Sequence, residues 1–176
     1  MSSSDDEKRA AESALPIPIP SERRQVSVLF ADMVEYTATV ERLGEENALA
    51  FIRMIYDKLT GVVRGHGGSV RGFAGDSVMA VFGVPEAQED AALRACRTAL
   101  ATHAAFAAAA DEIEARFGER PVMRVGASSG IAVMAPVEGE GAEPTAVGDT
   151  VNLASRLQKS GPAGRHHHLR RDATSR

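Results

Sequence analysis

Two apolar runs that border an aspartate constrain the fold of this chain more than any other feature. The first run, residues 25–31, leads directly into Asp32, and the second, residues 77–82, directly follows Asp76. Short apolar runs rich in β-branched residues are typical of buried strands. We therefore expect two carboxylates at the edge of a sheet, where such hard oxygen ligands suit Mg²⁺ or Mn²⁺.

Three segments between and after these runs have the patterns of helices. Apolar side chains recur at helical spacing in residues 45–63, which a glycine-rich segment then ends. Residues 89–117 are rich in alanine, which favours helix strongly, and residues 150–158 keep a helical period. We also expect a helix to begin shortly after Asp32.

Three further strands complete the expected order β-α-β-β-α-β-β-α. Residues 69–73 and 77–82 read as a hairpin with Gly75 and Asp76 in its turn. Residues 122–126 and 130–135 read as two separate strands. Helices that follow groups of strands predict an α+β fold, with a sheet backed by helices on one face.

Composition narrows the class of protein. The chain has 176 residues, of which 44% are apolar, so we expect one globular domain with its own core. A net charge of -4 gives no electrostatic footprint for nucleic acid, and no stretch is long and apolar enough to span a membrane. With no secretory signal and a single cysteine, Cys96, we expect a cytoplasmic location.

Both ends of the chain are expected to lie outside the folded domain. Residues 1–24 are predicted to form a flexible tail whose alternating prolines favour polyproline II, either as a linker or along the folded body. Residues 165–176 form a basic tail that contains His166, His167 and His168. Adjacent histidines rarely converge on one ion, so a solvated tail is preferred to a metal site.

Three segments together resemble the catalytic domain of class III adenylyl and guanylyl cyclases. They are VLFADMV at residues 28–34, GDSVMAVFG at residues 75–83 and VGDTVNLASRL at residues 147–157, in the order and spacing of the family. The resemblance covers residues 25–164 and implies a ferredoxin-like (βαββαβ) domain with an antiparallel-rich sheet. The family usually continues with more sheet after this point, which raises the alternative of a truncated C-terminus.

The resemblance implies a specific chemistry for the two aspartates. Asp32 and Asp76 would hold two Mg²⁺ or Mn²⁺ ions per active site. The ribose 3′-hydroxyl of a nucleoside triphosphate would attack the α-phosphate, giving a 3′,5′-cyclic nucleotide and pyrophosphate. The alternative is that each aspartate only caps a helix or stabilises a turn. Main-chain N–H groups would cradle the phosphates at Met33, Val34, Glu35 and Tyr36.

Asn152 and Arg156 are the catalytic residues that the resemblance implies. They are four residues apart, which places them on one face of a helix. In the family the asparagine orients the ribose and the arginine stabilises charge on the α-phosphate, a role that suits a guanidinium. The alternative is a capping asparagine beside a surface arginine.

Base recognition is where this chain departs from the family. The lysine that usually reads adenine is replaced by Gly72, whereas Thr145 matches a threonine variant of its partner position. Arg71 is adjacent, but neighbouring strand residues point to opposite faces unless a bulge intervenes. ATP is the expected substrate because it is the commoner one in the family. Glu35 stands where the family often has glycine, so its carboxylate is expected to point away from the nucleotide.

The family builds its site across a two-fold dimer, and this one chain carries both halves. We therefore expect a homodimeric adenylate cyclase, with room for a regulatory domain outside this chain. The alternative is a catalytically degenerate module that binds nucleotide or regulates through dimerisation. Gly72 and the short C-terminus favour that alternative. The residues that favour the enzyme are Asp32, Asp76, Asn152 and Arg156. An unrelated metal-binding α/β domain would require the motif matches to be chance.

Overall fold

The computed structural model describes residues 22–74, 77–135 and 145–161. Asp76, the predicted tail 165–176 with its histidine run, and residues 1–21 of the predicted N-terminal tail lie outside the described residues. Residues 22–24, also assigned to that tail, instead begin the first strand. The elements run, in chain order, β1 (Glu22–Met33), α2 (Tyr36–Gly65), β2 (Ser69–Ala74), β3 (Ser77–Phe82), α3 (Ala91–Phe117), β4 (Met123–Ala135), β5 (Thr145–Val147) and α4 (Asp149–Ser160).

The strands form one antiparallel sheet in the order β2-β3-β1-β4-β5. The first apolar run of the sequence lies at its centre: β1 pairs with β3 on one side and with β4 along its whole length on the other. Every residue of β1 from Val26 onward is buried, which explains why the run does not alternate with polar residues. The predicted α+β fold with an antiparallel sheet is therefore confirmed.

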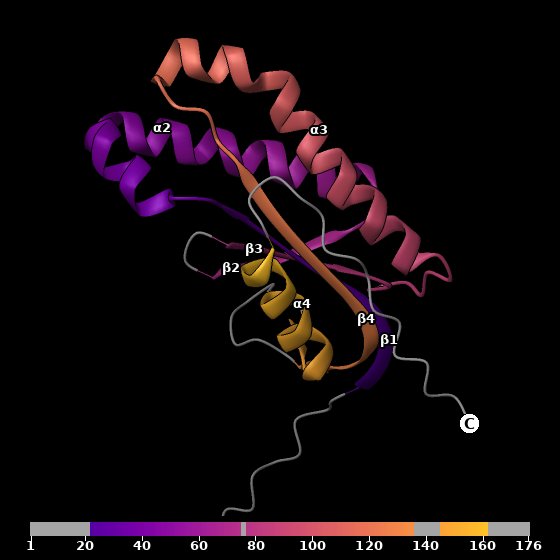
Figure 1. Ribbon diagram of the computed structural model, residues 1–176. Coiled ribbons are helices and arrows are strands. Elements are labelled where there is room, and N and C mark those ends of the chain that lie inside the picture. The colour runs from indigo at the N-terminus through magenta and orange to yellow at the C-terminus, as the bar shows by residue number, and fades with distance from the viewer. Residues whose placement is uncertain (1–21, 75–76, 136–144, 162–176) are drawn as a thin grey trace, which may run out of the picture.

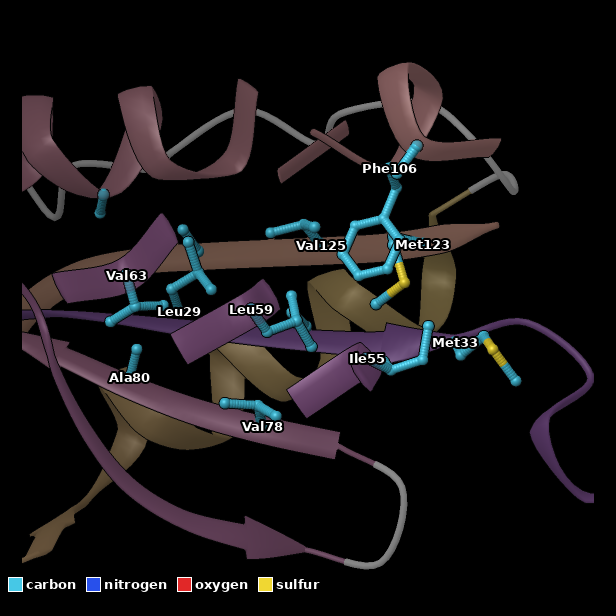
Figure 2. Packing of buried hydrophobic residues seen from close by; sticks show 14 of the residues in the cluster. Leu29, Met33, Ile55, Leu59, Val63, Val78, Ala80, Phe106, Met123 and Val125 are labelled. Carbon is cyan, nitrogen blue, oxygen red and sulfur yellow. The ribbon is translucent and has the colours of Figure 1, made fainter. Parts of the chain in front are cut away.

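The two long helices cover one face of the sheet, as Figure 1 shows. Their inner residues pack on alternate residues of the central strands, so this face carries the larger part of the core. Figure 2 shows this packing from close by. Its labelled residues are Leu29, Met33, Ile55, Leu59, Val63, Val78, Ala80, Phe106, Met123 and Val125.

The third helix, α4, lies over the other face of the sheet (Figure 1). There Ala154 packs with Val28 and Phe30 of β1, which point away from α2 and α3. The helices-on-one-face prediction therefore holds for the two long helices, while α4 adds cover to the opposite face. This helix carries the third of the sequence motifs.

Two differences from the expected elements concern the second half of the chain. The predicted strands 122–126 and 130–135 are one continuous strand, because the small residues between them keep pairing with β1. Ser129 there hydrogen-bonds to Ser27 across the strands, with 2.6 Å between the hydroxyl oxygens. The short strand β5 was not predicted.

The first helix also differs in length from its periodic core. It begins at Tyr36, shortly after Asp32 as expected, and contains a non-helical residue at Gly44 (φ 71°, ψ 165°). The apolar period starts just after this kink, which explains why residues 45–63 stood out in the sequence. No helix in the described part of the chain combines the length and the hydropathy needed to span a bilayer.

Candidate active site

Asp32 lies near the carboxyl end of the central strand and is buried, with 6% of its surface exposed. Two donors from different elements converge on its Oδ2. Arg124 Nη2 of β4 and Gln158 Nε2 of α4 each donate to that oxygen at 3.0 Å. The carboxylate is thus held between the sheet and the helix above it.

The sheet register explains the contact with Arg124. Asp32 and Arg124 are direct cross-strand partners in the β1–β4 ladder. Cross-strand partners lie close enough for opposite charges to pair, and a buried carboxylate requires such compensation. The side chain of Arg124 is 30% exposed, so the pair lies at the border of the core rather than deep within it.

The close packing of α4 on β4 explains the contact with Gln158. A Cβ added at Gly126 would lie 2.1 Å from the backbone N of Gln158 and 2.6 Å from the carbonyl O of Ala154. Only glycine therefore lets the helix backbone rest directly on the strand. This contact brings Gln158, which is 1% exposed, over the end of β1.

Neither Arg124 nor Gln158 was among the predicted site residues. A signal for Gln158 was present in the sequence, because it shares the buried stripe of α4 with Thr150 and Ala154. A polar amide on a buried helix face needs a hydrogen-bond partner. Its partner could not be named without the register of the sheet.

The turn between β1 and α2 is the segment predicted to cradle phosphates. Met33 belongs to β1 and is buried, and the Val34 N–H donates to the Val122 carbonyl at 2.8 Å. The Val34 N–H is therefore already hydrogen-bonded within the domain and does not point to a phosphate. Glu35 is exposed and left-handed (φ 57°, ψ 30°), a conformation that glycine adopts most easily. This backbone accounts for the glycine that the family often has there.

The second predicted metal ligand, Asp76, lies outside the described residues. It directly precedes Ser77, and the β1–β3 register pairs Ala31 with Val78. The start of β3 therefore lies beside the end of β1 that carries Asp32. No cluster of three or more potential metal-binding side chains occurs within residues 22–74, 77–135 and 145–161.

Asn152 and Arg156 lie on the exposed face of α4. Ala154 and Gln158, two residues further along in each case, are buried against the sheet. Two residues correspond to about 200° around a helix, so the first pair faces away from the sheet. Within one subunit, the predicted catalytic pair and Asp32 therefore lie on opposite sides of α4.

The base-recognition positions lie on the two edge strands of the sheet. In β2 the pairing passes from Val70 opposite Ala80 to Gly72 opposite Met79, so Arg71 is the extra residue of a bulge. The bulge interrupts the alternation that would have separated Arg71 from the Gly72 position. A Cβ at Gly72 would meet no atom within 4 Å. Thr145 begins β5 at the opposite edge.

Two ion pairs outside this site lower the pKa of a carboxyl group. The hydrogen bond from Arg42 lowers the pKa of Glu119, and the hydrogen bond from Arg94 lowers the pKa of Asp90. Burial raises the pKa of the Cys96 thiol, which suits an unreactive residue in a helix.

Residues 19–170 match the family described as "Adenylate and Guanylate cyclase catalytic domain". The chain belongs to this family. Adenylate cyclase 1 of Rhizobium meliloti is 35% identical over 137 residues, which cover 77% of this chain and 21% of that protein. Adenylate cyclase 2 of the same organism is 27% identical, with coverage of 80% and 38%. The cyclase domain described here thus spans well under half the length of these relatives.

Solved structures of cyclases share the same architecture. The guanylyl cyclase Cya2 superposes with a TM-score of 0.77 and 27% identity, covering 83% of this chain and 75% of that one. The adenylyl cyclase CyaB from P. aeruginosa gives a TM-score of 0.77 and 25% identity, covering 83% and 76%. The cyclase family is therefore established, and its members include enzymes named for either purine nucleotide.

Proposed function

We propose that this domain is an adenylate cyclase, which converts ATP to 3′,5′-cyclic AMP and pyrophosphate at the interface of a homodimer. The observation that carries this proposal is the division of the predicted site around α4. Asp32 lies beneath the helix, whereas Asn152 and Arg156 lie on its outer face. One subunit cannot present both groups to one substrate, but two subunits related by a two-fold axis can.

Asp32 and Asp76 are the proposed ligands of two Mg²⁺ or Mn²⁺ ions. The donor set fits, because carboxylate oxygens are the ligands that these hard cations prefer. Bound divalent cations would neutralise the triphosphate and lower the pKa of the attacking 3′-hydroxyl. Arg124 and Gln158 hold the Asp32 carboxylate in place from β4 and α4.

The outer face of α4 is the proposed contribution of the second subunit. Asn152 would hold the ribose, and Arg156 would donate to the α-phosphate oxygens as negative charge develops there. A guanidinium stays ionised and presents several donors, so it can follow the changing geometry at phosphorus. Both side chains are exposed in the single chain, as a contribution to a partner's site requires.

The start of α2 is the proposed binding site for the phosphate chain. The first bond of this helix runs from the Thr39 N–H to the Glu35 carbonyl. The amides from Tyr36 to Ala38 come before that bond and carry the positive end of the helix dipole, which attracts phosphate. The amides of Met33 and Glu35, proposed from the sequence, would act at the entrance of the same turn.

The choice of ATP over GTP is proposed from the names of the two Rhizobium relatives. Gly72 offers no side chain, so Arg71 is the residue that we propose donates to the base. Thr145 would accept from, or donate to, its other edge. Arg71 is only a donor, whereas a guanine presents two acceptors on one edge, so GTP is the competing substrate to measure.

The decisive experiment is a product assay on the purified chain with Mn²⁺ and either ATP or GTP. We expect cyclic AMP and pyrophosphate in equal amounts, and loss of both products in Asp76→Asn. Arg71→Ala should reduce the discrimination between ATP and GTP without abolishing turnover. A folded dimer that binds ATP but forms no cyclic product would contradict the proposal. Gly72 makes such a nucleotide-binding regulatory module the second candidate.

The regulation of the protein is inferred from the length of its relatives. Because the two Rhizobium relatives are longer than this domain, we propose a regulatory domain outside this chain, and we also propose a cytoplasmic location.

A further inference from the structure

The Asp32 carboxylate contacts the helix whose outer face carries Asn152 and Arg156. Gln158 Nε2 donates to Asp32 Oδ2 at 3.0 Å, and Gln158 is among the largest fully buried side chains of the domain. This hydrogen bond is therefore shielded from water, which would otherwise replace it at little cost.

The close packing of α4 on the sheet couples any movement of this hydrogen bond to a movement of the helix. At its C-terminal half the helix backbone rests on Gly126 without space for a methyl group. At its N-terminal end Thr150 Oγ1 donates to the Ile131 carbonyl at 2.9 Å. In so closely packed an interface, a shift of the Gln158 side chain requires a shift of the helix.

Two donors share one oxygen of Asp32, and one of them is a cation. Arg124 and Gln158 both donate to Oδ2 at 3.0 Å. A divalent cation that binds this carboxylate competes with the guanidinium for its negative charge and draws the carboxylate towards itself. Gln158 then either follows the carboxylate or loses its hydrogen bond in a buried place.

We propose that Gln158 is a positioning residue that transmits metal binding at Asp32 to the placement of α4. The inference rests on the proposed function and deepens it. In the proposed homodimer, α4 of each subunit serves the site that contains the partner's aspartates. The hydrogen bond between Asp32 and Gln158 thus connects the two active sites through a single subunit, and occupancy of one site by metal adjusts the catalytic helix of the other.

The test uses the full chain, Mn²⁺ alone as the probe and two readouts that need no turnover. Electron paramagnetic resonance of free Mn²⁺ gives the affinity, and hydrogen exchange resolved by residue gives the protection of α4. The variant is Gln158→Met, which keeps an unbranched side chain of similar length and cannot donate. The matched control is Thr150→Val, which removes a different hydrogen bond between α4 and the sheet, that from Thr150 to Ile131, and leaves the contact with Asp32 in place.

We expect Mn²⁺ to change the exchange of amides in residues 149–160 of the wild-type protein and of Thr150→Val. In Gln158→Met this response should disappear, and Mn²⁺ affinity should fall by about 10-fold, as for other partners of ligating carboxylates. Melting curves recorded by circular dichroism identify any variant that does not fold.

Two results would overturn this inference alone, and a third would also overturn the proposed metal site. Wild-type protein that binds Mn²⁺ with no change in α4 exchange refutes it, whatever the variants do. An equal loss of response in Gln158→Met and Thr150→Val also refutes it, because general loosening of the helix would then explain both. Wild-type protein that fails to bind Mn²⁺ refutes the proposed metal site together with this inference.

Discussion

At the scale of single residues, the candidate site depends on how the Asp32 carboxyl group is held in place. Its side chain is 8% exposed, and a carboxylate with so little water around it needs a nearby cation. Arg124 supplies that cation from the neighbouring strand, and Gln158 supplies a neutral donor from α4. Together they orient the carboxylate before any ligand arrives.

Removing Arg124 should therefore cost stability as well as function. We expect Arg124→Met to lower the free energy of unfolding by about 2 kcal/mol, since it leaves a mostly buried charge without its cation. The value is set below that for a fully buried pair because the Arg124 side chain is 30% exposed. Urea denaturation followed by circular dichroism measures the difference.

The matched control is an arginine whose ion pair is more exposed than the pair at Asp32. Arg42 donates to Glu119 at 2.8 Å, and the two side chains are 51% and 17% exposed. Exposed pairs contribute little because water and salt screen them, so Arg42→Met should destabilise the fold clearly less than Arg124→Met. Equal effects of the two substitutions would contradict the special role assigned to the pair at Asp32.

The sequence could predict Asp32 as a candidate site residue, which remains a prediction, but it could not predict the residues that hold its carboxylate. Asp32 could be identified because it ends an apolar run, a pattern visible in sequence. Arg124 becomes its partner only through a strand register that joins residues 92 positions apart. Gly72 and Arg71 show the same limit, since only the bulge in β2 removes their separation onto opposite faces.

At the scale of elements, α4 is held in place by a glycine on the strand beneath it. Gly126→Ala would place a methyl carbon 2.1 Å from the Gln158 backbone nitrogen, so the helix must move. We expect the free energy of unfolding to fall by about 3 kcal/mol or more. We also expect the protein that remains folded to lose cyclase activity, because α4 carries Asn152 and Arg156. Urea denaturation and the product assay provide the two measurements.

Gly61 in α2 offers the control for this substitution. A Cβ there would meet nothing within 4 Å, and the residue lies inside a helix. Gly61→Ala should stabilise the domain by about 0.5–1 kcal/mol through helix propensity. A Gly126→Ala protein as stable as the wild type would show that α4 is not seated as described.

The ion pair between Arg42 and Glu119 links α2 to the segment after α3 and predicts a pH dependence. The hydrogen bond from Arg42 lowers the pKa of Glu119 in the folded state. Its contribution to stability is therefore fully present above the ordinary carboxyl pKa and is lost as the pH falls through the lowered value. Glu119→Gln should be less stable than the wild type near neutral pH.

The measurement is a series of urea midpoints from about pH 7 to about pH 3. The difference between wild type and Glu119→Gln should shrink as the solution becomes more acidic. A difference that grows on acidification would give the opposite sign and contradict the assignment of the pair.

Apolar periodicity predicted which segments form helices and which form strands. It predicted less well where these elements end and which face of the sheet each helix covers. The long helices and the β2–β3 hairpin follow directly from apolar spacing and glycine punctuation. The break expected between residues 126 and 130 was wrong, because buried serines can pair in a central strand when they bond to each other, as Ser27 and Ser129 do. The strand β5 has only three residues and carries no period.

At the scale of the whole molecule, the two faces of the sheet are covered by different helices. Helices α2 and α3 bury one face in a large core, and α4 covers part of the other. The proposed chemistry lies on the side of α4, where each subunit offers Asp32 at the end of β1 and Arg156 on the outer surface of the helix. In the proposed dimer, each active site would combine Asp32 of one subunit with Arg156 of its partner.

Subunit complementation tests this shared site most directly. Asp32→Ala and Asn152→Ala should each be nearly inactive with ATP and Mn²⁺. After unfolding together and refolding, or after subunit exchange, mixed dimers should contain one site with neither substitution, so cyclic AMP formation should return to about a quarter of the wild-type rate for a statistical mixture. Mixed dimers verified by mass spectrometry that form no cyclic AMP would contradict the central claim.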